Sequence, residues 1–143
     1  MLAFNALAGE LLAGVHTRQG ESRDAMGFRR HYADIYWTEH NLDFTDAFIG
    51  LAAPFGRTPS ALAYAWTLAQ PAVTALNVGP RSQAGFDPVV QAIDNPLTAA
   101  EADAMQALLR RYPPLPPAPN ARPLDRREPL TVLGGLLPAS PRR

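Results

Sequence analysis

The stretch that decides the fold of this 143-residue chain runs from Gly56 to Ser82 and reads GRTPSALAYAWTLAQPAVTALNVGPRS. It opens with a helix signal, because the Thr58 side chain can cap free backbone N–H groups and Pro59 suits the first helical position. Apolar side chains then recur at helical spacing, at Leu62, Ala65, Trp66 and Ala69. This spacing predicts a helix with one apolar face, and we expect Trp66 to lie in the core.

A strand and a turn follow this helix. Gln70-Pro71 ends the helix, because proline disfavours helical geometry in the residue before it. Residues 72–78 form a short apolar run with β-branched members, which predicts a strand buried on both faces. The turn from Gly79 to Ser82 carries one cation, Arg81. Free N–H groups and a guanidinium at the end of a strand suit a phosphate.

Three blocks of the chain resemble the aldo-keto reductases. The stretch above is similar to that family's last helix–strand unit, GRTPAQLALAW–LAQP–V–IVGAR. Residues 4–14, FNALAGELLAG, are similar to the YSPLAGGLLTG loop after its seventh barrel strand. Residues 95–101, NPLTAAE, are similar to the PLSAEE start of its closing helix. The blocks follow the family's order, and the resemblance covers roughly residues 1–110.

The resemblance implies an α/β fold that is a partial TIM barrel. The expected part is the last two βα units of an aldo-keto reductase-like barrel, mostly helical by content. A complete barrel takes about 250 residues. The strand expected at residues 2–5 begins directly after Met1, which suggests that a further part of the fold precedes it. We expect it to pair in parallel with the strand at 72–78, through a helical crossover at 41–70.

Two strands cannot close a barrel. A sheet of this size has two unpaired edges and one uncovered face, and it is marginal by itself. We therefore expect the chain to fold only partially, to self-associate or to dock on a complementary barrel fragment.

The remaining elements are predicted from local signals. A polar, variable loop is expected from His16 to Glu39. Residues 41–55 read as an amphipathic helix that Pro54 and Gly56 end. The next helix, within 82–94, should start only near Asp87, because a proline inside a helix costs about 3 kcal/mol. The apolar stripe of the helix at 41–55 consists of Leu42, Ala47, Phe48, Leu51 and Ala52. A capping box from Thr98 to Glu101 opens a final helix that runs to about Tyr112.

The composition changes at residue 113. Nine of the fifteen prolines lie within 113–143, together with five Arg and two acidic residues. Such a segment forms neither a ladder nor a helix, so we expect a disordered Pro/Arg-rich tail. Residues 1–112 are then the oxidoreductase-like domain. Residues 113–117, PPLPP, also resemble a ligand for an SH3-like groove, and we favour the plain tail.

Composition also excludes several function classes. The formal net charge is zero, so nothing points to nucleic acid or an anionic membrane. The chain has no cysteine, which excludes disulfides and thiolate metal sites. No stretch approaches the roughly 20 apolar residues of a membrane span, and we expect a cytoplasmic protein. His16, His31 and His40 share no ligand spacing, so no metal site is expected.

The resemblance also implies which chemistry the chain lacks. Aldo-keto reductases pass a hydride from a nicotinamide to a carbonyl, and the proton comes from a Tyr tuned by a Lys, an Asp and a His on the first four barrel strands. All thirteen basic residues of this chain are Arg, and none is Lys. We therefore predict no catalytic residue in it, since the acid–base group is missing.

Although the catalytic residues are missing, the resemblance still implies part of an NADP-binding site. It implies that Asn5, Leu7 and Gly9 belong to a loop over the pyrophosphate. It further implies that three residues hold the adenosine 2′-phosphate, namely Gly79, Arg81 and Ser82. The sequence departs from the family's pattern in four ways: Asn5-Ala6 replaces Ser-Pro, Glu10 replaces a Gly and could repel a pyrophosphate, and Gly85 and Val89 replace a Gln and an Asn that touch the nucleotide.

These observations favour the C-terminal part of an NADP(H)-dependent aldo-keto reductase, which would act in carbonyl reduction or alcohol oxidation by hydride transfer. The alternative is a non-catalytic remnant, or a module that binds a nucleotide or a protein. The absence of Lys favours this alternative for the isolated chain. Arg81 also has an alternative interpretation, as a solvated surface arginine.

Overall fold

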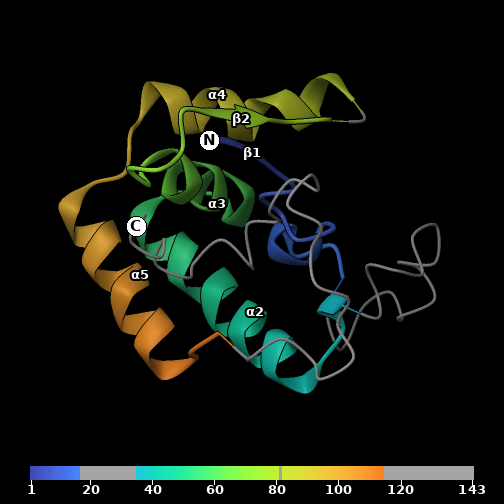
Figure 1. The fold of residues 1–143 in the computed structure, drawn as a ribbon, viewed down its shortest axis with the longest axis vertical. Coiled ribbons are helices and arrows are strands. Elements are labelled where there is room, and N and C mark those ends of the chain that lie inside the picture. Colours follow the sequence, from blue (N-terminus) through green and yellow to red (C-terminus); the bar gives the residue numbers. More distant parts are fainter. Residues whose placement is uncertain (17–34, 81, 115–143) are drawn as a thin grey trace, which may run out of the picture.

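The computed structural model describes residues 1–16, 35–80 and 82–114 (Figure 1). Three expectations fall on residues outside these ranges. They are the variable loop within 17–34, the cation Arg81 and the Pro-rich tail beyond residue 114. These expectations stay predictions.

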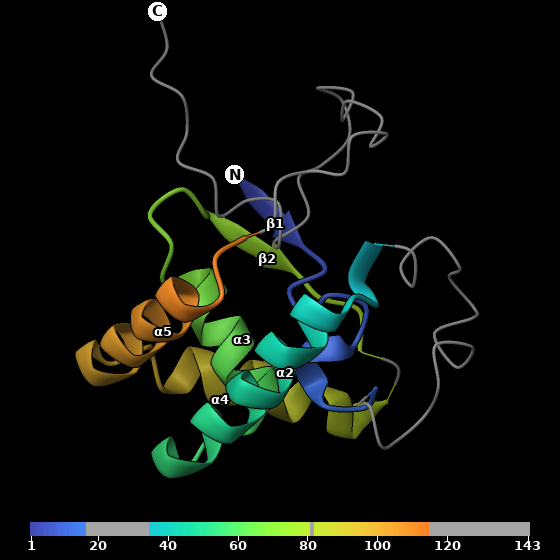
Figure 2. The ribbon, with the colours of Figure 1, turned by 90° about the horizontal axis from the view of Figure 1, so that it is seen from below.

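The described sheet has two parallel strands, β1 (Leu2–Phe4) and β2 (Ala75–Asn77). Leu2 is paired with Ala75, and Phe4 with Asn77. Beside this ladder, the amino group of Met1 donates to the carbonyl of Ala72 at 2.9 Å. The predicted parallel pair is therefore confirmed. Figure 2 shows the helices gathered on one side of the two strands.

The prediction for the second strand was wrong in length and in burial. Residues 72–74 lie outside β2, and the Val73 N–H donates to the Gln70 carbonyl in a turn after the helix. Ala75 and Asn77 are exposed, and Leu76 is half-buried. A strand is buried on both faces only where layers cover both sides of the sheet. The described helices cover one side, so half of this apolar strand faces outward.

The crossover between the strands is helical, as predicted. It contains η1 (Leu11–Ala13), α2 (Glu39–Ala52), η3 (Ala53–Phe55) and α3 (Pro59–Leu68). Helix α2 begins two residues before the predicted Asn41, because the Thr38 side chain accepts a hydrogen bond from the Asn41 N–H. The α-helix ends at Ala52, three residues before the predicted end, and residues 53–55 form η3 with Pro54 inside it. Gly56, at a φ of +67°, then ends the helical segment, as predicted. The predicted apolar stripe of α2 lies in or against the core.

Helix α3 is the centre of the fold. Its predicted start is confirmed, because the Thr58 side chain accepts from the Ala61 N–H and Pro59 is the first helical residue. The prediction of a single apolar face was wrong: all seven residues from 61 to 67 are buried, and Ala69 is exposed. The reason is that α2, η1, α4 and β2 all pack around α3. A helix that is enclosed on several sides has no solvent face along its middle turns.

The last two helices match their local signals. A 3₁₀ turn, η4 (Gln83–Phe86), leads into α4 (Asp87–Asp94). The α-helix therefore starts at Asp87, as the position of Pro88 predicted. Helix α5 (Ala99–Arg111) opens with the predicted capping box of Thr98 and Glu101. Met105 and Leu108 are buried and join the core.

The core consists of two clusters that meet at α3. The larger cluster joins η1, α2, α3 and α5, around Leu11, Phe48 and Leu62. The smaller cluster joins the loop after β1, α3 and α4, through buried Ala6, Tyr64 and Ala92. Trp66 is buried in the larger cluster, as predicted. No helix among the described residues has both the length and the apolar character that crossing a membrane requires.

Candidate functional site

The loop after β1 is built on left-handed backbone. Asn5, Ala8, Gly9 and Glu10 all have positive φ, from +51° to +75°. Asn5 holds the loop together: its side-chain oxygen accepts from the Gly9 N–H at 2.9 Å, and its carbonyl accepts from the Ala8 N–H at 2.9 Å. Its amide nitrogen donates to the Tyr36 hydroxyl at 3.1 Å. Asparagine tolerates the left-handed region better than most residues, so Asn5 fits its position.

The turn after β2 is packed closely at one point. A Cβ added to Gly85 would lie 2.8 Å from the Pro80 Cβ, so a side chain at this position would displace the turn. The Ser82 side chain accepts a hydrogen bond from the Gly85 N–H at 3.2 Å and caps η4. By contrast, a Cβ on Gly79 would meet no atom within 4 Å. Close packing of Pro80 against Gly85 therefore restricts this turn, whereas the space beside Gly79 is not filled by other atoms.

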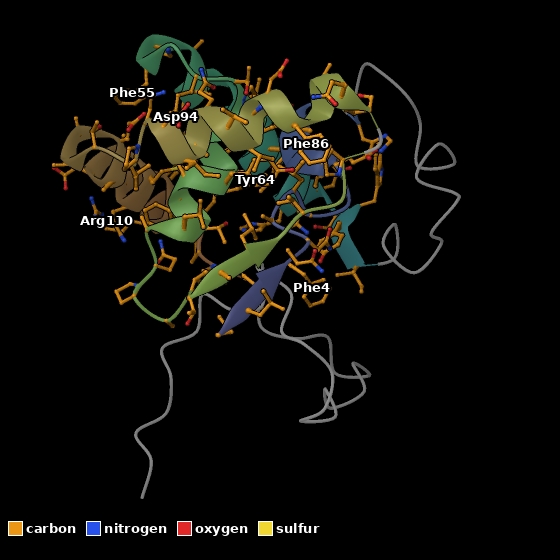
Figure 3. The ribbon with its side chains drawn as sticks, turned by 90° about the horizontal axis from the view of Figure 1, so that it is seen from above. Phe4, Phe55, Tyr64, Phe86, Asp94 and Arg110 are labelled. Atoms are coloured by element: carbon orange, nitrogen blue, oxygen red, sulfur yellow. The ribbon has the colours of Figure 1, made fainter. Side chains whose placement is uncertain are left out.

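A groove of about 260 Å³ lies where these two segments meet. It lies beyond the carboxyl ends of β1 and β2, which is where parallel α/β sheets bind their ligands. Figure 3 shows Tyr64 on α3 and Phe86 before α4, with the two strands below them. The lining residues are Asn5, Ala6, Leu7, Glu10, Ala13, Val15, Ser60, Tyr64, Asn77, Val78, Gly79, Pro80, Gly85 and Pro88.

The groove brings together three of the predicted site residues. Asn5, Leu7 and Gly79 all line it. Gly9, which directly precedes Glu10, and Ser82 are not among the lining residues. Arg81 lies outside the described residues. That these residues bind a cofactor stays a prediction.

Two further lining residues, Glu10 and Tyr64, give the groove its chemistry. Tyr64 is only 7% exposed, in the middle of α3. Its burial, and to a smaller extent the negative charge of Glu10, raise the pKa of the Tyr64 phenol. The phenol therefore stays protonated and can donate a hydrogen bond. The sequence analysis missed Tyr64; its signal was the spacing of four from Ser60, which places both side chains on one helical face.

Glu10 lines the groove from the other side. Its side chain is 35% exposed, and its Oε2 lies 3.8 Å from Nε2 of the buried His16. Glu10 is the one residue with a charged side chain among the described residues that line the groove. The described residues hold no cluster of three or more His, Cys, Asp or Glu suited to a metal ion.

Comparison with known proteins places the chain in a family. The family model described as aldo/keto reductase matches residues 1–110, which is more than half of the chain. The chain belongs to the aldo/keto reductase family. It is also similar to a solved structure, the glycerol dehydrogenase from Gluconobacter oxydans, with 28% sequence identity and a TM-score of 0.64. That match covers 85% of this chain and 37% of the dehydrogenase. A search of curated proteins found no match.

Membership in the aldo/keto reductase family confirms the resemblance on which the sequence analysis depended. The mostly helical described chain, with its parallel pair of strands, agrees with the α/β part of the fold prediction. The chain spans little more than a third of the length of the solved relative. The described part of the chain contains one groove at the ends of its two strands. The carboxylate of Glu10, the phenol of Tyr64 and the backbone of two turns line this groove.

Proposed function

We propose that this chain is the C-terminal part of an NADP(H)-dependent aldo-keto reductase barrel and that it holds part of the cofactor. The reaction of the assembled protein is carbonyl reduction or alcohol oxidation by hydride transfer. The observation that carries the proposal is the groove at the carboxyl ends of β1 and β2, which Asn5, Leu7 and Gly79 line. Barrel active sites are built at this end of the strands.

The groove fits part of a dinucleotide. Its volume of about 260 Å³ is somewhat below that of ordinary ligand pockets, which run from about 300 to 1,000 Å³, so it can hold only a portion of the cofactor. The open space at Gly79 leaves the turn accessible to a ligand. When bound, NADP(H) supplies the hydride. In the proposal, the loop from Asn5 to Gly9 and the turn at Gly79 orient the cofactor, and Arg81 and Ser82 hold its 2′-phosphate.

The acid–base groups of the reaction lie outside this chain in the proposal. The chain has no Lys, and the resemblance assigns the catalytic residues to the first four barrel strands. A complementary barrel fragment would supply these groups and complete the partial barrel, whereas a second copy of this chain, which also has no Lys, would only cover its exposed strands. The exposed outer side of the two-stranded sheet supports this, with Leu2 at 60% exposed.

The absence of Lys favours a second candidate, a non-catalytic module that binds a nucleotide or a protein. The first candidate turns over substrate once the rest of the barrel is supplied, whereas the second does not, whether it binds a nucleotide or a protein. The boundary at residue 112, the preference for NADP(H) and the cytoplasmic location stay predictions.

The test is a titration of the purified full chain with NADPH, followed by tryptophan fluorescence. Gly79→Leu adds a side chain at a residue that lines the groove, and Gly50→Leu makes the same change at an exposed position of α2. Neither added Cβ meets an atom within 4 Å, so neither change disturbs packing at its first atom. We expect saturable binding that Gly79→Leu weakens at least tenfold and that Gly50→Leu leaves unchanged. Wild-type chain that does not respond to NADPH would contradict the proposal.

A further inference from the structure

Tyr64 is a buried tyrosine whose hydroxyl is left without a hydrogen bond. Its side chain is 7% exposed, yet it makes no hydrogen bond to the residues that the structure describes. The buried Tyr36 shows the usual arrangement, because its hydroxyl accepts a hydrogen bond from the Asn5 amide at 3.1 Å. Most buried polar side chains have such a partner. A buried hydroxyl without one, at the edge of a groove, therefore points to a ligand.

The position of the Tyr64 ring is set by the core. The ring belongs to the smaller core cluster, together with Ala92 of α4 and Leu76 of β2 (Figure 3). Tyr64 also lines the groove, as does Ser60 one turn earlier on the same helix. A side chain that packing already holds in place can bind a ligand without first being ordered. Tyr64 is therefore a rigid hydrogen-bonding group at the groove.

The surroundings of the hydroxyl favour an uncharged acceptor. More than half of the side chains that line the groove are apolar, among them Ala6, Val78 and Pro80. Burial, and to a smaller extent the charge of Glu10, raise the pKa of the Tyr64 phenol, so the phenol stays a neutral donor. Burying a charged ligand group among apolar side chains costs more than burying a neutral one. A heterocyclic base fits such a lining, because it combines a flat apolar ring with uncharged nitrogen acceptors.

We infer that Tyr64 is a specificity-determining residue, whose hydroxyl donates a hydrogen bond to a ring nitrogen of the adenine base of a bound dinucleotide. This inference rests on the proposed function and deepens it, because it names the portion of NADP(H) that the groove holds. In the proposed function, the loop from Asn5 to Gly9 and the turn at Gly79 hold the charged phosphates. The adenine base lies between these two segments, where the groove is.

The first test removes only the hydroxyl. Tyr64→Phe keeps the ring in the core. Tyr112→Phe is the matched control, because Tyr112 packs against Phe44 in the larger cluster and does not line the groove. Calorimetric titration of the full chain with NADPH compares both variants with the wild type. We expect Tyr64→Phe to bind about three- to tenfold more weakly, as the loss of one neutral hydrogen bond predicts, and Tyr112→Phe to bind like the wild type.

Thermal melts without ligand separate recognition from folding. No described residue is hydrogen-bonded to the Tyr64 hydroxyl, so its removal should not lower the melting temperature. A purely structural hydroxyl would give the opposite result. A melting temperature for Tyr64→Phe that falls below those of the wild type and Tyr112→Phe would show that the protein itself holds this hydroxyl, and it would overturn the inference.

Three analogues of adenosine identify the acceptor. The 1-deaza, 3-deaza and 7-deaza forms each replace one ring nitrogen with carbon. One of them should bind the wild type about three- to tenfold more weakly than adenosine does, and Tyr64→Phe should bind that analogue and adenosine equally. Equal binding of adenosine and all three analogues by the wild type would overturn the inference, and so would a difference that persists in Tyr64→Phe.

The failure of this inference and the failure of the proposed function give different results. NADPH binding that Tyr64→Phe leaves unchanged overturns the inference and leaves the proposed function standing. Adenosine binding that depends on Tyr64, without any response to NADPH, supports the contact with the base and contradicts the proposed cofactor. A wild-type chain that binds neither NADPH nor adenosine overturns both.

Discussion

Arg57 and Glu101 form a buried ion pair that joins the start of α3 to the start of α5. The guanidinium meets the carboxylate through two nitrogens: Nε donates to Oε1, and Nη2 donates to Oε2 at 3.0 Å. Nη2 also donates to the Pro96 carbonyl at 3.1 Å. Arg57 is 9% exposed and Glu101 is 3% exposed. The same carboxylate completes the capping box of α5 through Thr98, so one side chain fixes both a helix start and a contact between helices.

Loss of the carboxylate should destabilise the fold strongly. Glu101→Gln leaves the guanidinium of Arg57 buried without its counter-charge, which costs about 3–5 kcal/mol in comparable buried pairs. Asp103→Asn is the matched control, because Asp103 lies exposed on the same helix. Its effect should stay within about 0.5 kcal/mol. Urea unfolding of the wild type, Glu101→Gln and Asp103→Asn measures the loss of stability in each variant. Equal midpoints for Glu101→Gln and the wild type would show that the ion pair does not stabilise the fold.

The same pair predicts how stability depends on pH. The hydrogen bond from Arg57 lowers the pKa of Glu101 from 4.5 to about 2. A lowered pKa in the folded state means that the unfolded chain takes up the proton first as the pH falls. Stability from this group is therefore complete above pH 4.5 and is lost as the pH falls toward 2. The full loss is on the order of 3 kcal/mol.

Melting temperatures measured between neutral pH and the acid end of this window check the prediction. Other carboxylates titrate in the same range, so the informative quantity is the difference between wild type and Glu101→Gln. That difference should shrink as the pH falls. A constant difference across the window would mean that Glu101 titrates normally in the folded chain.

Gly85 is the glycine whose packing decides the shape of the groove. An added Cβ would lie 2.8 Å from a ring carbon of Pro80, which cannot swing away as a flexible side chain would. We expect Gly85→Ala to destabilise the chain by about 1–3 kcal/mol, as overpacking does. Gly79→Ala should have little effect, because its Cβ meets no atom within 4 Å. Thermal melts of both variants test this, and a higher melting temperature for Gly85→Ala would show that the turn is loosely packed.

Local signals in the sequence predicted most of the element starts. Thr58-Pro59 and the Thr98 box fixed two helix starts, and Pro88 fixed a third. Capping and proline rules act over four residues, so a short stretch contains all the information they need. The start of α2 was misplaced because the cap at Thr38 was not considered.

Burial and site composition depend on contacts that a linear pattern does not contain. The apolar run at 72–78 predicted a covered strand, whereas its exposure depends on which layers lie beside it. Glu10 and Tyr64 both line the groove although they are far apart in the sequence. The sequence analysis named Glu10 only as a departure from the family's loop, and it did not name Tyr64. The family motifs named Asn5, Leu7 and Gly79, and all three line the groove, but their role in holding a cofactor stays a prediction.

The exposed side of β1 should drive association with other strands. Side chains alternate along a strand, and here Leu2 is 60% exposed while Ala3 is 2% exposed. Leu2→Arg places a charge on the outer side, where it should hinder association and leave folding intact. Ala3→Arg places the same charge in the core and should unfold the chain, since a buried unpaired charge is among the costliest changes. Sedimentation velocity over a range of concentrations, together with circular dichroism, separates the two effects. If wild type and Leu2→Arg are equally monomeric and equally stable, the outer side of this sheet does not need a partner, and the proposal of a barrel completed by another chain segment loses its main support.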